Sequence, residues 1–320
     1  MTDILVIKPS SVGDILHGLQ VAQSIKDQAP DSRITWVVRD RFAPLVETCA
    51  TVDDVLLFHR GQGPAAFLRL LRDIRARHYD IVLDFPGLAR TGAMTCAARA
   101  ARKIGRGDAR EGAGLFYGER APLPAAGRQS HAVDILLQFL PLLGLRPELG
   151  GPLDYAPTAP LAPIDPRLDD ARPVLLCPHS RGAEKDWPGF AALADRLCRE
   201  RPDLDIVWDS MTKTAGPPPA SGPRFIDTAG RTGLGELVAL VAASRLVVAN
   251  DSGPMHLAAA LGRPVVALFG PSAPARFGPY PPDRPGHRVV TAPDGDLRRL
   301  DVDIVFDIVT EALGAPSAGG

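Results

Sequence analysis

Three short polar stretches combine residue types that could transfer a chemical group. The first, Lys8 to His17, reads Lys-Pro-Ser-Ser-Val-Gly-Asp-Ile-Leu-His and follows an apolar run at the start of the chain. It contains neither Gly-x-Gly-x-x-Gly nor Gly-Lys-Ser/Thr, so neither a standard dinucleotide site nor a P-loop is predicted. The loop instead delivers Asp14 to the amino end of a helix. There the carboxylate could simply cap the helix or act as a general base.

The second stretch, Pro178 to Pro188, carries two cations. Arg181 and Lys185 follow a predicted strand that ends at Cys177, and Pro188 is expected to be the first residue of the next helix. Solvated surface charge is the ordinary interpretation of such a loop. Beside an anion-binding helix, however, the same two cations would suit a diphosphate.

The third stretch, Asn250 to Gly262, follows an apolar run at 245–249 that is typical of a buried parallel strand. Asp251 or Ser252 is expected to cap a helix that begins at the carboxyl edge of the sheet. Free N–H groups and the helix dipole favour an anion such as phosphate there. An ordinary capped helix is the alternative. His256, Asp251 and Ser252 are not needed to pack that helix, which favours a binding site.

Strands and helices that alternate along the first half of the chain must position the first motif. The predicted strands are Ile4–Lys8, Ile34–Val38, Val55–Phe58, Ile81–Asp84 and Lys103–Arg106, and the predicted helices are Asp14–Gln28, Ala65–Arg77, Ala93–Arg102 and Ala132–Leu143. Residues 107–128 are rich in glycine, arginine and proline and are expected to form a long functional loop. Prolines recur through residues 145–172, which indicates an extended linker.

The alternation then restarts. The predicted strands are Val174–Cys177, Asp205–Trp208, Arg224–Asp227, Arg245–Ala249 and Pro264–Phe269, and the predicted helices are Phe190–Arg201, Leu234–Ala243, the helix that ends at Gly262, and Val302–Leu313. Repeated strand–helix units imply parallel sheets with right-handed crossovers. We therefore expect an α/β protein of two doubly wound, Rossmann-like domains that face a central cleft. The expected boundaries are 1–150, a linker at 151–172, 173–300, and a final helix and tail at 301–320.

The composition of the chain argues against several classes of function. The 320 residues are 45% hydrophobic, enough for one large core or two, and the formal net charge of −1 gives no electrostatic case for nucleic acid. The chain shows no signal-peptide pattern at its start and no apolar run of the ~20 residues that a membrane span needs. A cytoplasmic protein is therefore expected rather than an exported sugar-binding protein. The four cysteines are widely spaced, which predicts free thiols rather than a zinc site.

Taken together, these motifs resemble the bacterial lipopolysaccharide heptosyltransferases, glycosyltransferase family nine. The resemblance runs from Lys8 to about Tyr280. It rests on Lys8-x-Ser10-Ser11-x-Gly13-Asp14-x-x-His17, Arg181-x-x-x-Lys185-x-Trp187-Pro188, Asn250 to Leu261, and Val266 to Pro274. It implies a GT-B fold. It also implies metal-independent, inverting transfer of a heptose from ADP-heptose to the inner core of lipopolysaccharide.

The resemblance also implies residue roles. Asp14 matches the base that deprotonates the acceptor hydroxyl, and Lys185 matches the lysine that neutralises the departing diphosphate. The residues implied in donor binding are Ser11, Gly13, Arg181, Lys185, Asp209, Asp251, Ser252, Gly253, Met255 and His256. The residues implied in acceptor binding are Ser10, Arg60, Arg110 and His131. No Asp-x-Asp pair lies near these motifs, so no metal is expected. The co-substrate is a nucleotide sugar, and the acceptor lies at the inner membrane surface.

Two departures keep alternatives open. The family's Asp-x-Gln-Gly after the fourth strand is replaced by Asp84-Phe85-Pro86-Gly87, so a polar acceptor contact is lost. In the family a glycine-rich turn with an acidic residue usually helps to hold the nucleoside. Here the corresponding segment, Asp209 to Pro219, has a single glycine followed by three prolines. One alternative is therefore the same mechanism with another donor or acceptor. The other is a catalytically silent protein that binds sugar nucleotides.

Overall fold

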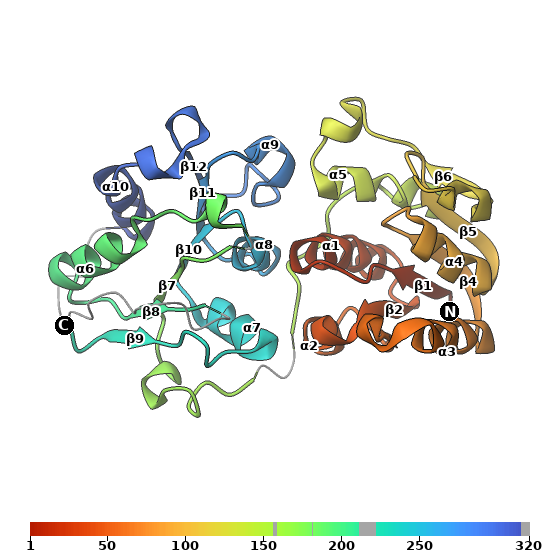
Figure 1. Cartoon of the computed structure of the whole chain (residues 1–320), viewed down its shortest axis with the longest axis horizontal. Helices are drawn as coiled ribbons and strands as arrows, with labels where there is room; N and C mark the ends of the chain where they lie inside the picture. Colours follow the sequence, from red (N-terminus) through yellow and green to blue (C-terminus); the bar gives the residue numbers. More distant parts are fainter. Residues whose placement is uncertain (156–158, 181, 211–221, 315–320) are drawn as a thin grey trace. The chain divides into compact units, whose positions relative to one another are not determined.

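The computed structural model describes residues 1–155, 159–180, 182–210 and 222–314. The chain divides into two compact units, Met1–Pro157 and Thr158–Gly320. Each unit contains one six-stranded sheet whose strands all run parallel, with helices on both of its faces (Figure 1). The predicted pair of doubly wound α/β domains is therefore confirmed. No helix within the described residues is long and apolar enough to cross a membrane.

The sheet of the first unit has the strand order β3-β2-β1-β4-β5-β6. Its strands are β1 (Asp3–Ile7), β2 (Arg33–Arg39), β3 (Asp54–Phe58), β4 (His78–Asp84), β5 (Arg99–Arg106) and β6 (Glu119–Ala121). Its helices are α1 (Val12–Gln28), α2 (Ala43–Glu47), α3 (Gly63–Ala76), α4 (Ala89–Ala97) and α5 (Ala132–Leu137). The direction of winding reverses between β1 and β4. Ligands of open α/β sheets bind outside the carboxyl ends of the strands at such a switch point.

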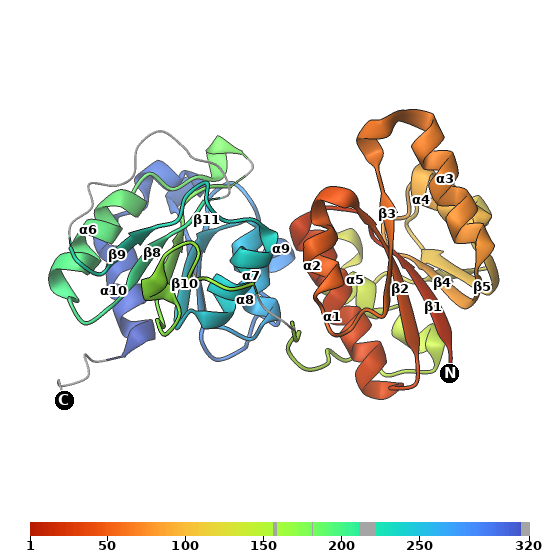
Figure 2. The ribbon, with the colours of Figure 1, turned by 90° about the horizontal axis from the view of Figure 1, so that it is seen from below.

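Apolar side chains on both faces of this sheet pack against the helices that cover it. Leu5 and Ile7 of β1 belong to a buried cluster that includes Leu70 of α3 and Met94 of α4. Helix α1 covers the opposite face, where Gly18 allows close packing on an indole ring: a Cβ at this position would lie 2.9 Å from the ring of Trp36. Figure 2 shows this sheet between α1 and α5 on one side and α3 and α4 on the other.

The second unit repeats the same winding, with strand order β12-β11-β10-β7-β8-β9. Its strands are β7 (Val174–Cys177), β8 (Ile206–Trp208), β9 (Phe225–Asp227), β10 (Leu246–Asn250), β11 (Val265–Phe269) and β12 (His287–Thr291). Its helices are α6 (Phe190–Glu200), α7 (Leu234–Ala243), α8 (Gly253–Ala260), α9 (Pro274–Phe277) and α10 (Val302–Leu313). The switch point lies between β7 and β10. Helices α6 and α10 pack on one face of the sheet through Phe190, Leu193 and Phe306.

Two predicted helices are wrong in extent. The predicted helix Ala93–Arg102 is helical only to Ala97, and residues 99–106 form β5, which pairs with β4. Alanine and arginine favour a helix, but pairing with a buried neighbouring strand outweighs that weak preference. The predicted helix Ala132–Leu143 ends at Leu137 and is followed by a separate 3₁₀ turn that contains Pro141, whose missing N–H interrupts helical hydrogen bonding.

Two short edge strands were not predicted. Strand β6 lies within the expected loop at 107–128 and is only three residues long. Strand β12 pairs with β11 at the other sheet's edge, and its sequence His-Arg-Val-Val-Thr does not alternate cleanly. Both strands form because they pair with a neighbouring strand, and neither has an apolar pattern that would predict a strand by itself.

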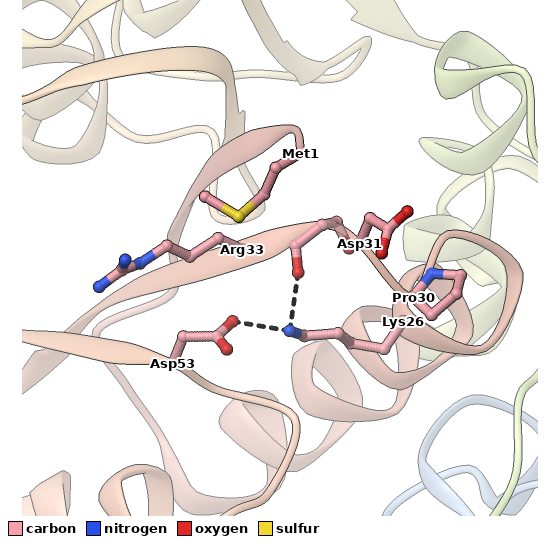
Figure 3. A pocket seen from close by; sticks show the side chains of 7 residues that line it. Met1, Lys26, Pro30, Asp31, Arg33 and Asp53 are labelled. Atoms are coloured by element: carbon pink, nitrogen blue, oxygen red, sulfur yellow. Dashed lines mark hydrogen bonds and ion pairs between the residues drawn. The ribbon is translucent and has the colours of Figure 1, made fainter.

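A pocket of about 590 Å³ opens at the amino ends of β1 and β2 (Figure 3). Lys26 Nζ donates a hydrogen bond to the carbonyl of Ser32 at 2.7 Å and pairs with Asp53 Oδ2 at 2.7 Å. The motif that carries Asp14 follows the carboxyl end of β1, so this pocket lies at the opposite edge of the sheet from that motif.

Candidate functional site

The loop after β1 positions Asp14 through a capping box. Ser11 is the N-cap residue of α1, and its backbone N–H and hydroxyl donate to Asp14 Oδ2 at 3.2 and 2.7 Å. Lys8 Nζ lies 3.1 Å from Asp14 Oδ1. The side chain of Asp14 remains 48% exposed. Asp14 therefore caps the helix, yet its carboxylate, which has four lone-pair sites, still has room to accept a ligand hydroxyl. Ser10 and Gly13 flank it in the same loop and first turn.

The pKa of Asp14 is shifted downward. Desolvation by neighbouring atoms opposes its ionisation, but the ammonium of Lys8 and the two hydrogen bonds from Ser11 outweigh that effect. The pKa therefore lies well below the usual aspartate value. Asp14 is an anion at neutral pH.

Helix α5 brings His131 close to this corner. His131 is the N-cap residue of α5, and its Nδ1 accepts the backbone N–H of Val133 at 3.1 Å. Its ring meets that of His17 edge-on, with centroids 5.5 Å apart. His17 lies one turn after Asp14 on α1. His131 is only 6% exposed, so the structure places it beside the Asp14 corner as a buried group, and its contact with an acceptor stays a prediction.

Four arginines gather where β2 and β3 end and α4 begins. We call Arg39, Arg41, Arg60 and Arg90 the arginine cluster. Burial lowers the pKa of Arg39, and the positive charges of Arg41, Arg60 and Arg90 lower it further. Its Nε is buried and has no hydrogen-bond partner among the described residues. A partly buried guanidinium with one unsatisfied donor, beside three like charges and the carboxylate of Asp40, can bind an anion.

Aromatic rings support the cluster. The guanidinium of Arg41 lies 4.4 Å from the ring centroid of Phe42, and that of Arg90 lies 5.7 Å from the centroid of Phe58. Arg60 was predicted as an acceptor contact, whereas the other three members were missed. The available signal was the run Arg39-Asp40-Arg41 directly after a predicted strand.

The loop that carries Arg110 is docked on the loop after β4. The backbone N–H of Arg110 donates to the carbonyl of Gly87 at 2.8 Å, and that of Ala89 donates to Glu111 Oε2 at 3.1 Å. Asp84 is fully buried between the two loops and accepts the hydroxyl of Tyr117 at 2.7 Å. Burial raises the pKa of Asp84. This aspartate therefore organises the loops, while Arg110 remains exposed beside them.

In the second unit an ion pair joins the loops after β7 and β10. Lys185 Nζ lies 2.6 Å from Asp251 Oδ2, and His256 Nε2 lies 3.9 Å from Asp251 Oδ1. The side chain of Asp251 is 7% exposed, and that of Lys185 is 33% exposed. The structure thus brings three of the predicted donor residues together at the switch point of this sheet.

Asn250 fastens the loop that carries Lys185. Its Oδ1 accepts the backbone N–H of Trp187 at 3.2 Å, and its Nδ2 donates to the carbonyl of Pro178 at 2.7 Å. The expectation that Pro188 begins the next helix is wrong, because α6 begins at Phe190. Pro188 and Gly189 form a turn that precedes the helix, and Asn250 holds Trp187 at the end of β10 just before that turn. Arg181, the other predicted cation, lies outside the described residues.

The first turn of α8 is prepared for an anion. Ser252 is its N-cap residue, one of the two residues expected there, but its side chain makes no capping hydrogen bond. Ser252 Oγ is buried without a partner among the described residues. Gly253 is the first helical residue, and Met255 has a fully buried side chain that leaves only its backbone facing the turn. An unsatisfied hydroxyl beside free backbone N–H groups and the positive helix end matches a phosphate group.

Asp209 lies at the end of β8 and is 2% exposed. Its Oδ1 accepts the hydroxyls of Thr228 and Thr232 at 2.8 and 2.6 Å. Burial raises its pKa. Asp209 has a structural role here, and its contact with a nucleotide stays a prediction. Over the residues that the structure describes, no group of three or more His, Cys, Asp or Glu side chains is arranged to hold a metal.

Comparison with known proteins identifies similar chains. The model of glycosyltransferase family 9 (heptosyltransferase) matches residues 67–294. Lipopolysaccharide heptosyltransferase 1 of Salmonella typhimurium is 28% identical over 95% of this chain and 98% of its own. Lipopolysaccharide heptosyltransferase 1 of Pseudomonas aeruginosa is 30% identical over 87% of this chain and 81% of its own.

Solved structures share the fold. The E. coli heptosyltransferase WaaC with ADP has a TM-score of 0.78 and 24% identity over 97% of this chain and 99% of its own. A family 9 glycosyltransferase from Veillonella parvula has a TM-score of 0.83 and 22% identity over 98% of this chain and 97% of its own.

Proposed function

Since the chain belongs to glycosyltransferase family 9, we propose that it transfers a heptosyl group from ADP-heptose to a hydroxyl of the lipopolysaccharide core. The relatives that match along most of its length are lipopolysaccharide heptosyltransferases, and structures with this fold were solved with ADP and with an ADP-heptose analogue. The observation that carries the proposal is the pairing of Lys185 with Asp251 at the start of α8.

The second unit stabilises the leaving group. When the bond between the anomeric carbon and the diphosphate oxygen breaks, its electron pair and negative charge remain on ADP. Lys185, the hydroxyl of Ser252 and the free N–H groups of α8 are the cation and donors that stabilise this charge. Asp251 acts as a positioning residue that holds the ammonium of Lys185. Because these groups take the role that a divalent cation has in other transferases, transfer needs no metal.

Asp14 takes the acceptor proton. The acceptor oxygen bonds to the anomeric carbon on the face opposite the departing diphosphate, which inverts the configuration. A low pKa makes Asp14 a weak base toward a free hydroxyl. As the new bond forms, however, the acceptor oxygen becomes positively charged and its proton strongly acidic. A carboxylate that is always ionised can then accept the proton and hand it to solvent after release.

The arginine cluster supports an anionic acceptor. Four guanidinium groups, one with an unsatisfied buried donor, complement carboxylates or phosphates on a sugar core. Ser10 and Arg110 lie at the ends of β1 and β5 on the same edge of the sheet, and both remain proposed acceptor contacts. An acceptor of this class is anchored at the inner membrane surface.

Two readouts test the proposal. The protein is incubated with ADP-heptose and a heptose-free lipopolysaccharide core, with and without EDTA, and both ADP release and the mass of the acceptor are measured. We expect ADP release and one added heptose per acceptor in both reactions, with the inverted anomer by NMR. Activity that is lost in EDTA and restored by magnesium would overturn metal independence. ADP-heptose that binds without any product would favour the silent sugar-nucleotide-binding alternative, and transfer only from another nucleotide sugar would change the donor.

A further inference from the structure

Two neighbouring apolar side chains are exposed on the first unit. Leu115 is 84% exposed and Phe116 is 37% exposed, at the end of a 3₁₀ turn that spans Ala113–Phe116. We call these two residues the apolar tip. Single exposed apolar side chains are ordinary on protein surfaces. A leucine and a phenylalanine side by side on a loop tip expose more apolar area than a single side chain.

The apolar tip is held rigidly. At Gly92 of α4, an added Cβ would lie 2.9 Å from the ring of Phe116 and 3.0 Å from Cα of Ala113, so the turn packs directly on the helix backbone. Ala113 is fully buried, and Tyr117, which follows Phe116 in the chain, donates its hydroxyl hydrogen bond to Asp84. The chain therefore fixes the exposure of Leu115 in advance. Little conformational entropy remains to be lost when the apolar tip is buried in another phase.

Two exposed arginines lie beside the apolar tip. Arg120 Nη2 donates to the carbonyl of Gly114 at 3.0 Å, and the carbonyl of Arg110 accepts the N–H of Ala113 at 3.0 Å. Apolar side chains with a cationic rim are the pattern of segments that lie in the interface of an anionic membrane.

The position of the apolar tip also fits a membrane. Arg90 of the arginine cluster and Gly92, which packs against the apolar tip, both lie in α4, so this helix connects the proposed acceptor site to the apolar tip. A stable protein partner would bury about 800 Å² on each side, far more than two side chains provide. A bilayer interface accepts a small apolar insertion and neutralises the arginines with its phosphates.

We propose that Leu115 and Phe116 insert into the interface of an anionic bilayer while Arg110 and Arg120 contact lipid phosphates. This inference rests on the proposed function, because a lipid-linked acceptor would then reach the arginine cluster from the same surface.

The test separates binding from catalysis. The full chain is sedimented with vesicles of phosphatidylethanolamine and phosphatidylglycerol, and with vesicles of phosphatidylcholine alone. We expect binding to the anionic vesicles and much weaker binding to the zwitterionic ones. In Leu115→Ser/Phe116→Ser, binding to the anionic vesicles should weaken at least about tenfold, since two buried apolar side chains are lost. Arg120→Gln should weaken it about fivefold.

Ile304→Ser is the matched control, because Ile304 is 50% exposed but lies on α10 without that arginine rim. It should bind vesicles like the wild type and keep the wild-type melting temperature. Leu115→Ser/Phe116→Ser should unfold at a slightly lower temperature, because Phe116 packs against Gly92, so vesicle binding is measured well below its melting temperature. Transfer to a water-soluble core oligosaccharide should be the same in Leu115→Ser/Phe116→Ser as in the wild type. If the wild type itself does not transfer heptose to this acceptor, the proposed function is refuted, whatever the vesicle binding shows. Equal vesicle binding by wild type and double variant, equal loss in Ile304→Ser, or no binding by the wild type would each overturn the membrane inference.

Discussion

Lys185 Nζ lies 2.6 Å from Asp251 Oδ2, and this contact joins the loops that follow β7 and β10. The carboxylate is nearly buried at 7% exposure, so it depends on its cation. The lysine is more open and retains donors for a ligand. One ion pair thus completes the switch point of the second sheet and holds a positive charge at the start of α8.

Replacing Lys185 by Ala should weaken ADP binding and slow transfer by about 2–4 kcal/mol, because the cation beside the leaving group is lost. Stability should also fall, because Asp251 is left buried and unpaired. Lys185→Ala/Asp251→Ala should recover stability but not ADP affinity. Calorimetric titration and thermal unfolding measure the two effects, with Lys103→Ala as control. Unchanged donor affinity in Lys185→Ala would mean that the lysine does not reach the diphosphate.

Asp14→Asn should lower kcat by about 10²–10⁴ while folding and ADP affinity stay near wild type. Asparagine can still accept the hydrogen bonds from Ser11 but cannot take a proton. Because the pKa of Asp14 is lowered from 3.8, ionisation of Asp14 should not limit the rate at any pH above that value. Asp73→Asn, on an exposed face of α3, is the control. An active Asp14→Asn enzyme would reduce Asp14 to a helix cap.

Arg39→Gln should lower kcat/KM for the anionic acceptor about tenfold to hundredfold without changing ADP affinity, since one charged donor to the acceptor is lost. Its stability should rise slightly, because burial and three neighbouring arginines disfavour the charge on Arg39. Arg99→Gln at the opposite edge of the sheet is the control. Wild-type acceptor kinetics combined with higher stability would show that the arginine cluster binds something other than the acceptor.

Diphosphate nucleotides should all stabilise the protein, with ADP best by a modest margin. The diphosphate site of Lys185 and α8 makes no contact that depends on the nucleobase. The segment after Asp209, which usually helps to hold the nucleoside, has an atypical sequence. Binding at a hundredfold excess over Kd adds about 2.7 kcal/mol, so thermal shifts rank ADP, UDP, GDP and CDP. A clear preference for UDP or GDP would exclude ADP-heptose as the donor. Lys185→Ala should reduce all four shifts.

Asp209→Asn should stabilise the fold at neutral pH. Burial raises the folded-state pKa of Asp209 above 3.8, so the protonated form contributes stability below that pH, and this contribution is lost as the pH rises through the folded-state pKa. Asparagine keeps an oxygen for Thr228 and Thr232 without the buried charge. Thermal unfolding against pH should show a gain that disappears below pH 3.8, with the exposed Asp170→Asn as control. A large loss of ADP affinity in Asp209→Asn would instead indicate a nucleotide contact.

The sequence alone was sufficient for the doubly wound fold and for the loops that carry Asp14, Lys185 and Asp251. Each of these loops follows an apolar strand, and the carboxyl ends of parallel strands meet at one edge of a sheet. A strand, the turn after it and the start of the next helix are each encoded by neighbouring residues, so the sequence predicts them without knowledge of the tertiary structure. The pattern could not decide where the alanine-rich segment at 93–102 changes from helix to strand, because pairing with β4 makes that choice.

Only the tertiary structure assembles the arginine cluster. Arg39, Arg60 and Arg90 belong to three segments far apart in the chain, and only Arg39 lies in a charged run, Arg39-Asp40-Arg41. They meet because β1, β2 and β3 are neighbours in the sheet and α3 and α4 pack on its face. The pairing of Lys185 with Asp251, 66 residues apart, has the same origin. Which side chains come within ion-pair distance depends on strand order and burial, and both arise from packing that no short stretch of sequence contains.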